Sequence, residues 1–468
     1  MQISRNLAPD RRAAATNQFL RCATLGLSFP GLSFAVLALI AAGATVPARA
    51  ASGFEVPPVL KASDLAPPEL LKGPRFHVDP EVPTDGLLAK FTIRSDFGDF
   101  VAEGPGMLGI RVGEIQALDV MSKTEKSEVF QRALVGSAKR TGKSIATAVT
   151  HPVETAKGLP AGVGRFFQRV GRGVKTGAQG ASNYMSGTKE EGEEAPTSGE
   201  AAQQVGSAAA DIIGQQDSRR RVAKVLKVDP YTTNPVLDQK LNEFAWVVWA
   251  GEFGLDFGIN MVPGGMAITL TRTWVSDLVW DVNPGDLNVR AQKQLEELGV
   301  PAETIERFLR QKAFTLTTRT ALLEALAALG PGPGRVEVIP WALTAKSDTQ
   351  ARFIAGAVMI LAGYHKTNDP IAELRVSGTL IGRTKAGALI VPAPVDYVSW
   401  TERVAGFAKK PDLSAADREI WLTGRLSPRA RQELTRLHWV THEKVKAGVP
   451  RPGGPGVLEG TATNPSHE

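Results

Sequence analysis

The first 50 residues differ in pattern from the rest of the sequence, and their removal would determine how much of the chain is left to form a core. Basic residues precede an apolar run at Leu32–Ala44, and the small residues of Ala48–Ala50 follow it. This order is typical of a secretory signal peptide, and the run is shorter than the roughly 20 apolar residues of a membrane anchor. We therefore expect residues 1–50 to be a signal peptide that is cleaved near Ala50. The mature protein is expected in the periplasm or outside the cell.

The loss of this segment changes the composition of the chain that folds. Cys22 is the only cysteine and lies within it, so residues 51–468 contain no disulfide, thiol nucleophile or thiolate ligand. The formal charge falls from +6 for the whole chain to +2 for residues 51–468. A balance so close to neutral argues against nucleic acid as a partner. Stability has to come from packed apolar surface, which a chain of roughly 400 residues can supply.

Proline, glycine and charge patterns divide the remaining chain into successive segments. They are a proline-rich extended lead-in at 51–83, a small β segment at 84–121, a basic amphipathic helical segment at 122–183, an acidic flexible linker at 184–218, a helical bundle domain at 219–365, a β-hairpin followed by helices at 371–445, and a disordered tail at 446–468. The predicted fold class is mainly α with a minor antiparallel β part, an α+β chain with a helical bundle core plus a small sheet. The β segments near 85–116 and 371–393 are expected to share that sheet.

Capping signals place the helices. Asn234 with Pro235 begins one helix, and Ser347 with Gln350 forms a capping box before another. Further helices are expected at 287–298, 302–312, 317–329, from Ser414 to Gly424, and from Ser427 onward. Two strands are expected at 372–382 and 387–392, joined by a turn.

Two pairs of residues offer catalytic chemistry. Glu252 and Asp256 lie four apart in an otherwise apolar stretch, where burial raises carboxyl pKa values and suits acid and base roles. The same spacing is expected at the solvated edge of an amphipathic helix. His438 and His442, with Glu443 adjacent, would share one face of a helix and could bind zinc. The alternative is an exposed helix end at which histidines favour the dipole. No third ligand can be nominated, so we expect no metal and no cofactor.

Two other patterns are weak. The sequence Gly136–Ser144 resembles a phosphate-binding loop but has five residues instead of four before Gly142-Lys143-Ser144, so no nucleotide partner is expected. The tryptophans all lie between Trp246 and Trp439 and could stack on sugars or lie at a membrane interface if exposed, but core packing is the better explanation.

The basic stretch is the strongest functional signal after the leader. Residues 122–180 carry eleven lysines or arginines and three glutamates, a local charge of +8. At helical spacing, apolar side chains gather within about a third of the circumference and cations project from the other side. The predicted contact residues are Arg165, Phe166, Phe167, Arg169, Val170, Arg172, Val174 and Lys175. The apolar stripe can face lipid, another chain or the protein's own core.

These observations lead to one expectation and one alternative. We expect an exported, non-enzymatic envelope protein that associates with an anionic membrane surface or with another envelope protein through the basic segment. The alternative is an extracytoplasmic hydrolase that uses the carboxylate pair or a histidine-based metal site.

Overall fold

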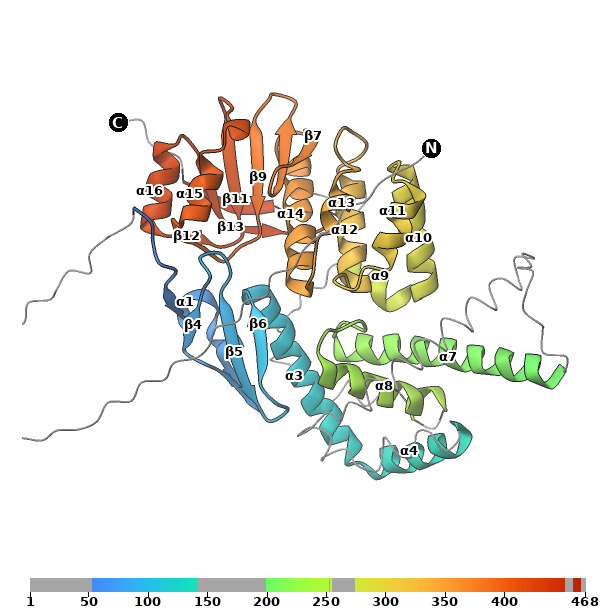
Figure 1. The fold of residues 1–468 in the computed structure, drawn as a ribbon. Coiled ribbons are helices and arrows are strands. Elements are labelled where there is room, and N and C mark those ends of the chain that lie inside the picture. Colours follow the sequence, from blue (N-terminus) through green and yellow to red (C-terminus); the bar gives the residue numbers. More distant parts are fainter. Residues whose placement is uncertain (1–52, 142–198, 252, 255–273, 451–457, 464–468) are drawn as a thin grey trace, which may run out of the picture. The chain divides into compact units, whose positions relative to one another are not determined.

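Figure 1 shows the fold in a computed structural model, which describes residues 53–141, 199–251, 253–254, 274–450 and 458–463. All of these residues belong to one compact unit, Ser52–Glu468. Among them, no helix combines the length and the apolar character that crossing a membrane requires.

The largest sheet has six strands and lies in the C-terminal part of the unit. Its order is β14 (Leu458–Thr463), β13 (Val440–Ala447), β11 (Arg418–Leu422), β9 (Leu389–Ala393), β8 (Leu380–Thr384) and β7 (Ile371–Val376). The strands β9, β11 and β13 are parallel to one another, whereas β14, β8 and β7 pair antiparallel with their neighbours. Parallel strands need long connections, and helices supply them here.

Helices cover both faces of this sheet (Figure 1). Ile390 and Trp421 lie in the same apolar cluster as the helix α14 (Asp348–Thr367). The alternating residues Val391 and Leu422 join a second cluster with α15 (Glu402–Ala408) and α16 (Pro428–Arg436). Side chains alternate between the two faces of a strand, so a sheet that is covered on both sides is apolar on both sides. The short strands β10 (Tyr397–Val398) and β12 (Arg425–Leu426) and a 3₁₀ turn at Pro411–Leu413 complete the connections.

A smaller β lobe forms the N-terminal part. One sheet has the order β2 (Lys72–Gly73), β3 (Phe76–Val78), β5 (Lys90–Ser95) and β6 (Phe100–Glu103), and a separate pair joins β1 (Val59–Lys61) to β4 (Glu81–Pro83). The helices α1 (Ala62–Leu65) and α2 (Pro68–Leu71) lie between β1 and β2. Phe91 and Ile93 of β5 pack on Leu108 of the long helix α3 (Pro105–Glu125), and all three are fully buried.

The remaining helices form two groups. The first consists of α3, α4 (Glu128–Thr141), α7 (Gly199–Leu226) and α8 (Pro235–Trp249), which share one apolar cluster. The second consists of α9 (Trp274–Asp281), α10 (Pro284–Glu297), α11 (Ala302–Leu309), α12 (Leu316–Ala328) and α13 (Val338–Ala342), which pack with α14.

The predicted fold class is wrong. The structure is α+β with extensive sheets, not a helical bundle with a minor antiparallel part. The β segments near 85–116 and 371–393 do not share a sheet, because β5 pairs with β3 and β6 whereas β7, β8 and β9 join β11 and β13. The parallel pairs are formed between strands that are far apart in the sequence, where local patterns carry no information about pairing.

Three local predictions also differ from the structure. The lead-in at 51–83 forms short strands and helices, and part of the 184–218 linker belongs to α7. The helix expected from Ser414 to Gly424 is instead the strand β11. Its residues Ile420 and Leu422 are buried among β9, β13 and the covering helices, and this tertiary setting overrides the local cap signal.

The helices predicted to begin at Asn234, Ser347 and Ser427 are confirmed. Asn234 accepts from the N–H groups of Val236 and Leu237 at the start of α8, and Ser347 accepts from Gln350 N at the start of α14. Gln350 Oε1 in turn accepts from Lys346 N at 2.7 Å, one residue before the position that a standard capping box uses. Ser427 caps α16 in the same way, through Ala430 N at 2.9 Å.

Candidate functional site

The predicted contact residues lie outside the part of the chain that the structure describes. They are Arg165, Phe166, Phe167, Arg169, Val170, Arg172, Val174 and Lys175. The structure does describe the helix that precedes residues 142–198, α4, and the helix that follows them, α7.

Both of these helices are packed on α8. Phe130 of α4 lies against Phe244 of α8 with ring centroids 4.5 Å apart, and Val222 of α7 is fully buried in the same cluster. We call the four helices α3, α4, α7 and α8 the platform. The described helices before and after residues 142–198 therefore both contribute to one apolar core.

Charged groups inside the platform are paired with one another. Lys240 Nζ lies 2.7 Å from Glu125 Oε1 and 2.9 Å from Glu243 Oε2, which links α8 to the end of α3. The Arg219 guanidinium joins α7 to α8 through Asp238 Oδ1 at 2.6 Å. Such partly buried ion pairs fix the relative register of the helices and do not require a ligand.

Apolar side chains remain exposed on the helices next to the undescribed region. Val129 and Val135 of α4 are 55% and 56% exposed, and Ile213 of α7 is 68% exposed. Single exposed apolar residues are ordinary on protein surfaces.

The histidine pair does not form the predicted helical metal site. His438 is exposed in a turn with φ 58° after α16, and His442 is on the strand β13. The ring of His442 stacks on Trp421 with centroids 3.9 Å apart, and Glu443 is bound to Arg431 at 2.7 Å. Trp439, which was predicted to lie on the same helix, is buried and directly precedes β13. Among the described residues, no group of three histidine, cysteine or acidic side chains is arranged to hold a metal ion.

His442 instead belongs to a paired cluster on the face of the sheet that α14 covers. Its Nε2 lies 2.9 Å from Glu419 Oε2, which also accepts from Trp421 Nε1 at 2.7 Å. Burial raises the pKa of the Glu419 carboxyl, but the neighbouring His442 and Trp421 outweigh this effect and hold the pKa below its usual value. The second catalytic pair, Glu252 and Asp256, lies outside the described residues.

A buried carboxyl that sequence patterns did not indicate lies at the carboxyl ends of the parallel strands. Asp396 follows β9, and its carbonyl accepts from Arg425 N, beyond the end of β11. Burial raises the pKa of Asp396 to about 6, since the N–H of Ala89 is a single opposing hydrogen bond and Asp85 adds repulsion. Ligands of parallel sheets bind at this edge, but here the loop that contains Leu87 and Ala89 is bound to it.

A scan against protein-family models and searches of curated proteins and of solved structures found no match. Function therefore has to be inferred from the chain's own residues. Among them, the basic residues of 122–180 are the feature that most directly indicates a kind of partner.

Proposed function

We propose that this chain is an exported, non-enzymatic protein of the cell envelope that attaches to an anionic membrane surface through the basic region between α4 and α7. The observation that supports this proposal most is the charge of +8 that residues 122–180 carry together with an apolar stripe at helical spacing. The described helices on either side, α4 and α7, both pack on α8.

The chemistry of the region suits a boundary between water and lipid. Arg165, Arg169, Arg172 and Lys175 can meet anionic head groups, while Phe166, Phe167 and Val170 can enter the acyl boundary. Each cation near such a surface contributes on the order of 1 kcal/mol at low salt. The mature chain outside residues 122–180 carries a formal charge of −6, so the attraction to anionic lipid is concentrated in residues 122–180.

The platform defines how the test is made. A deletion that starts at residue 122 would remove the end of α3 and all of α4, with the buried Phe130, and would damage the core. Residues 142–198 should instead be replaced by a short Gly–Ser linker between α4 and α7. We expect the unmodified protein to co-sediment with phosphatidylglycerol-containing vesicles and the linker variant to lose this binding.

A charge variant keeps the length of the region as a matched control. Replacing Arg165, Arg169, Arg172 and Lys175 by glutamine is expected to weaken vesicle binding roughly tenfold or more at low salt, because the attraction of several cations is removed. Replacing four cations outside the region, Lys90, Arg307, Arg310 and Lys312, should leave binding unchanged. Equal binding to neutral phosphatidylcholine vesicles, or undiminished binding by the linker variant, would refute the proposal. Capture of an envelope protein without vesicle binding would favour a protein partner instead.

A further inference from the structure

The first described residues of the chain are bound to segments that lie more than 300 residues later in the sequence. We call residues 53–56 the strap. The N–H of Glu55 donates to the carbonyl of Trp400 at 2.9 Å. The Glu55 carboxylate accepts from the N–H of Trp400 and from the hydroxyl of Ser427, at 2.5 Å each. Through this one residue, three hydrogen bonds join the strap to the segments that follow β9 and β11.

Glu55 also brings a carboxylate to the start of α16. This helix begins directly after Ser427, and its first turn contains Arg429 and Arg431 but no acidic residue. The N-terminal end of a helix favours negative charge and disfavours cations. Arg431 is paired with Glu443 at 2.7 Å. The Glu55 carboxylate therefore lies at a position where a negative charge is favourable and where α16 has none in its own first turn.

The other residues of the strap are weakly held. Phe54 and Val56, on either side of Glu55, are 38% and 87% exposed, and Gly53 is exposed as well. The strap thus buries little apolar surface, which is the main source of stability for a folded segment. A segment with few buried apolar contacts opens locally at a low free energy. The hydrogen bonds of Glu55 are therefore the main attachment of the strap.

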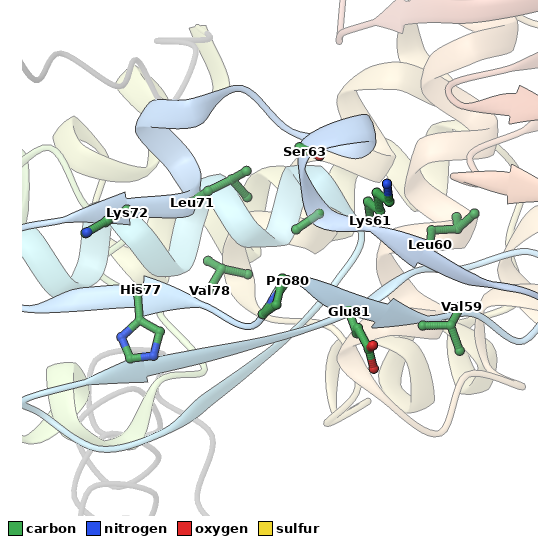
Figure 2. Close-up of a pocket in the computed structure, with 11 residues that line it drawn as sticks. Val59, Leu60, Lys61, Ser63, Leu71, Lys72, His77, Val78, Pro80 and Glu81 are labelled. Carbon is green, nitrogen blue, oxygen red and sulfur yellow. The ribbon is translucent and has the colours of Figure 1, made fainter.

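The chain is anchored again directly after the strap. Pro57 and Pro58 follow it, and the strand β1 (Val59–Lys61) then pairs with β4 (Glu81–Pro83). Figure 2 shows these two strands side by side. Proline fixes one backbone dihedral and so restricts the chain at this point. An opening motion that begins at the strap should consequently end at the two prolines and leave β1 in place.

A neighbouring loop, between β4 and β5, binds the same segment in a different way. The N–H groups of Asp396 and Tyr397 donate to the carbonyl of Leu87 at 2.8 and 3.1 Å. The N–H of Ser399 donates to the carbonyl of Gly86 at 3.1 Å. Leu87 also packs against the apolar cluster of α15 and α16. The loop is therefore held by apolar packing as well as by hydrogen bonds, unlike the strap.

We propose that the strap opens and closes over the segments that follow β9 and β11 while the rest of the protein stays folded, and that the Glu55 carboxylate is the group that holds it closed. Opening frees the Trp400 N–H, the Ser427 hydroxyl and the start of α16, which Glu55 occupies in the closed form. This conformational change involves only described residues and does not depend on the membrane attachment proposed above.

Amide hydrogen exchange of the unmodified protein, resolved to single residues, tests the opening itself. The N–H groups of Glu55 and Trp400 should exchange through the same event and show similar protection. Their exchange should be at least about tenfold faster than that of Asp396, Tyr397 and Ser399, which are bound to the loop. Low concentrations of urea should hardly change the exchange of Glu55 and Trp400, because a local opening exposes little surface.

The substitution Glu55→Ala tests the role of the carboxylate. The N–H of residue 55 keeps its acceptor, the Trp400 carbonyl, so its exchange reports whether the strap has left and not merely whether a bond was deleted. We expect this N–H and that of Trp400 to exchange at least about tenfold faster than in the unmodified protein. The three loop-bound amides should change by less than about threefold. Glu81→Ala removes an exposed carboxylate of the same lobe and should leave all five amides unchanged.

Three results would each overturn the proposal. In the unmodified protein, the first is protection of the Glu55 and Trp400 amides equal to that of the loop-bound amides. The second is undiminished protection of the residue 55 amide in Glu55→Ala, which would mean that the carboxylate does not hold the strap. The third is an equal loss of protection at strap-bound and loop-bound amides, which would mean that the strap does not open by itself. The first comparison needs no variant and decides the matter even if Glu55→Ala does not fold.

Discussion

Replacing Arg335 by methionine is expected to destabilise the protein by about 3–5 kcal/mol, because a buried charged donor that serves four carbonyl groups is lost. Arg335 is 2% exposed. Its guanidinium donates to the carbonyls of Ile371 and Ala372 at 2.8 Å each, and to those of Pro333 and Gly330 at 3.2 and 3.3 Å. Methionine keeps most of the alkyl packing and removes these four hydrogen bonds.

The effect should appear first at the edge of the large sheet. The strand β7 is the last in the order, and the segment 330–335 covers its outer edge, where Leu374 N donates to Pro333 O at 3.0 Å. Unfolding in urea measures the free energy, and amide hydrogen exchange of Ile371–Val376 should quicken more than exchange elsewhere in the sheet. Arg310→Met is the matched control, since Arg310 is 69% exposed and pairs only with Glu306. A loss below about 1 kcal/mol for Arg335→Met would contradict this account.

Local sequence signals were sufficient for the helices that have their own caps. Asn234, Ser347 and Ser427 each have a side-chain oxygen bound to a backbone N–H of the first helical turn. These contacts span only two or three residues and can be predicted from the sequence. The β region at 371–393 was predicted only in part, since the single strand expected at 372–382 is divided into the antiparallel strands β7 and β8.

The parallel core of the sheet could not be predicted in this way. Arg418–Leu422 has helix-like cap residues before it and becomes a strand because β9 and β13 flank it on both sides. Because of the same pairing, His442 lies on the strand β13 and His438 lies in the turn before it. The two histidines therefore do not share one face of a helix. A site predicted from helical spacing does not form when a strand distant in the sequence supplies the backbone hydrogen bonds.

Only part of the candidate site could be predicted from the sequence. The sequence identifies the charge and the apolar stripe of residues 122–183. The platform was not predicted, since the approach of α4 and α7 to α8 depends on Phe130, Val222 and Phe244, which are far apart in the chain. The approach of Lys72 to His77 also depends on register, because these residues become neighbours only through the pairing of β2 with β3.

Asp396→Asn is expected to stabilise the protein by about 2–3 kcal/mol at pH 7.5 and to have little effect near pH 3.5. An unfolded aspartate titrates near pH 4, and burial raises the pKa of Asp396 to about 6 in the folded protein. The folded state therefore holds the proton more tightly. The favourable contribution of this carboxyl is complete below about pH 4 and is lost as the pH rises through about 6. Asparagine cannot ionise, and its carbonyl oxygen can still accept from Ala89 N, so it avoids this loss.

The pH dependence is what distinguishes this explanation from a simple change in packing. The difference in unfolding free energy between Asp396→Asn and the unmodified protein should grow between pH 4 and 7 and then stay constant, as urea unfolding at several pH values can measure. Asp412 supplies a control of opposite sign, since its hydrogen bond from Ser377 lowers its pKa. Its contribution is present above about pH 4 and is lost as the pH falls through the lower folded pKa, so Asp412→Asn should destabilise the protein at neutral pH and not at low pH. A difference for Asp396→Asn that is the same at every pH would mean that the buried charge at the end of β9 does not oppose folding.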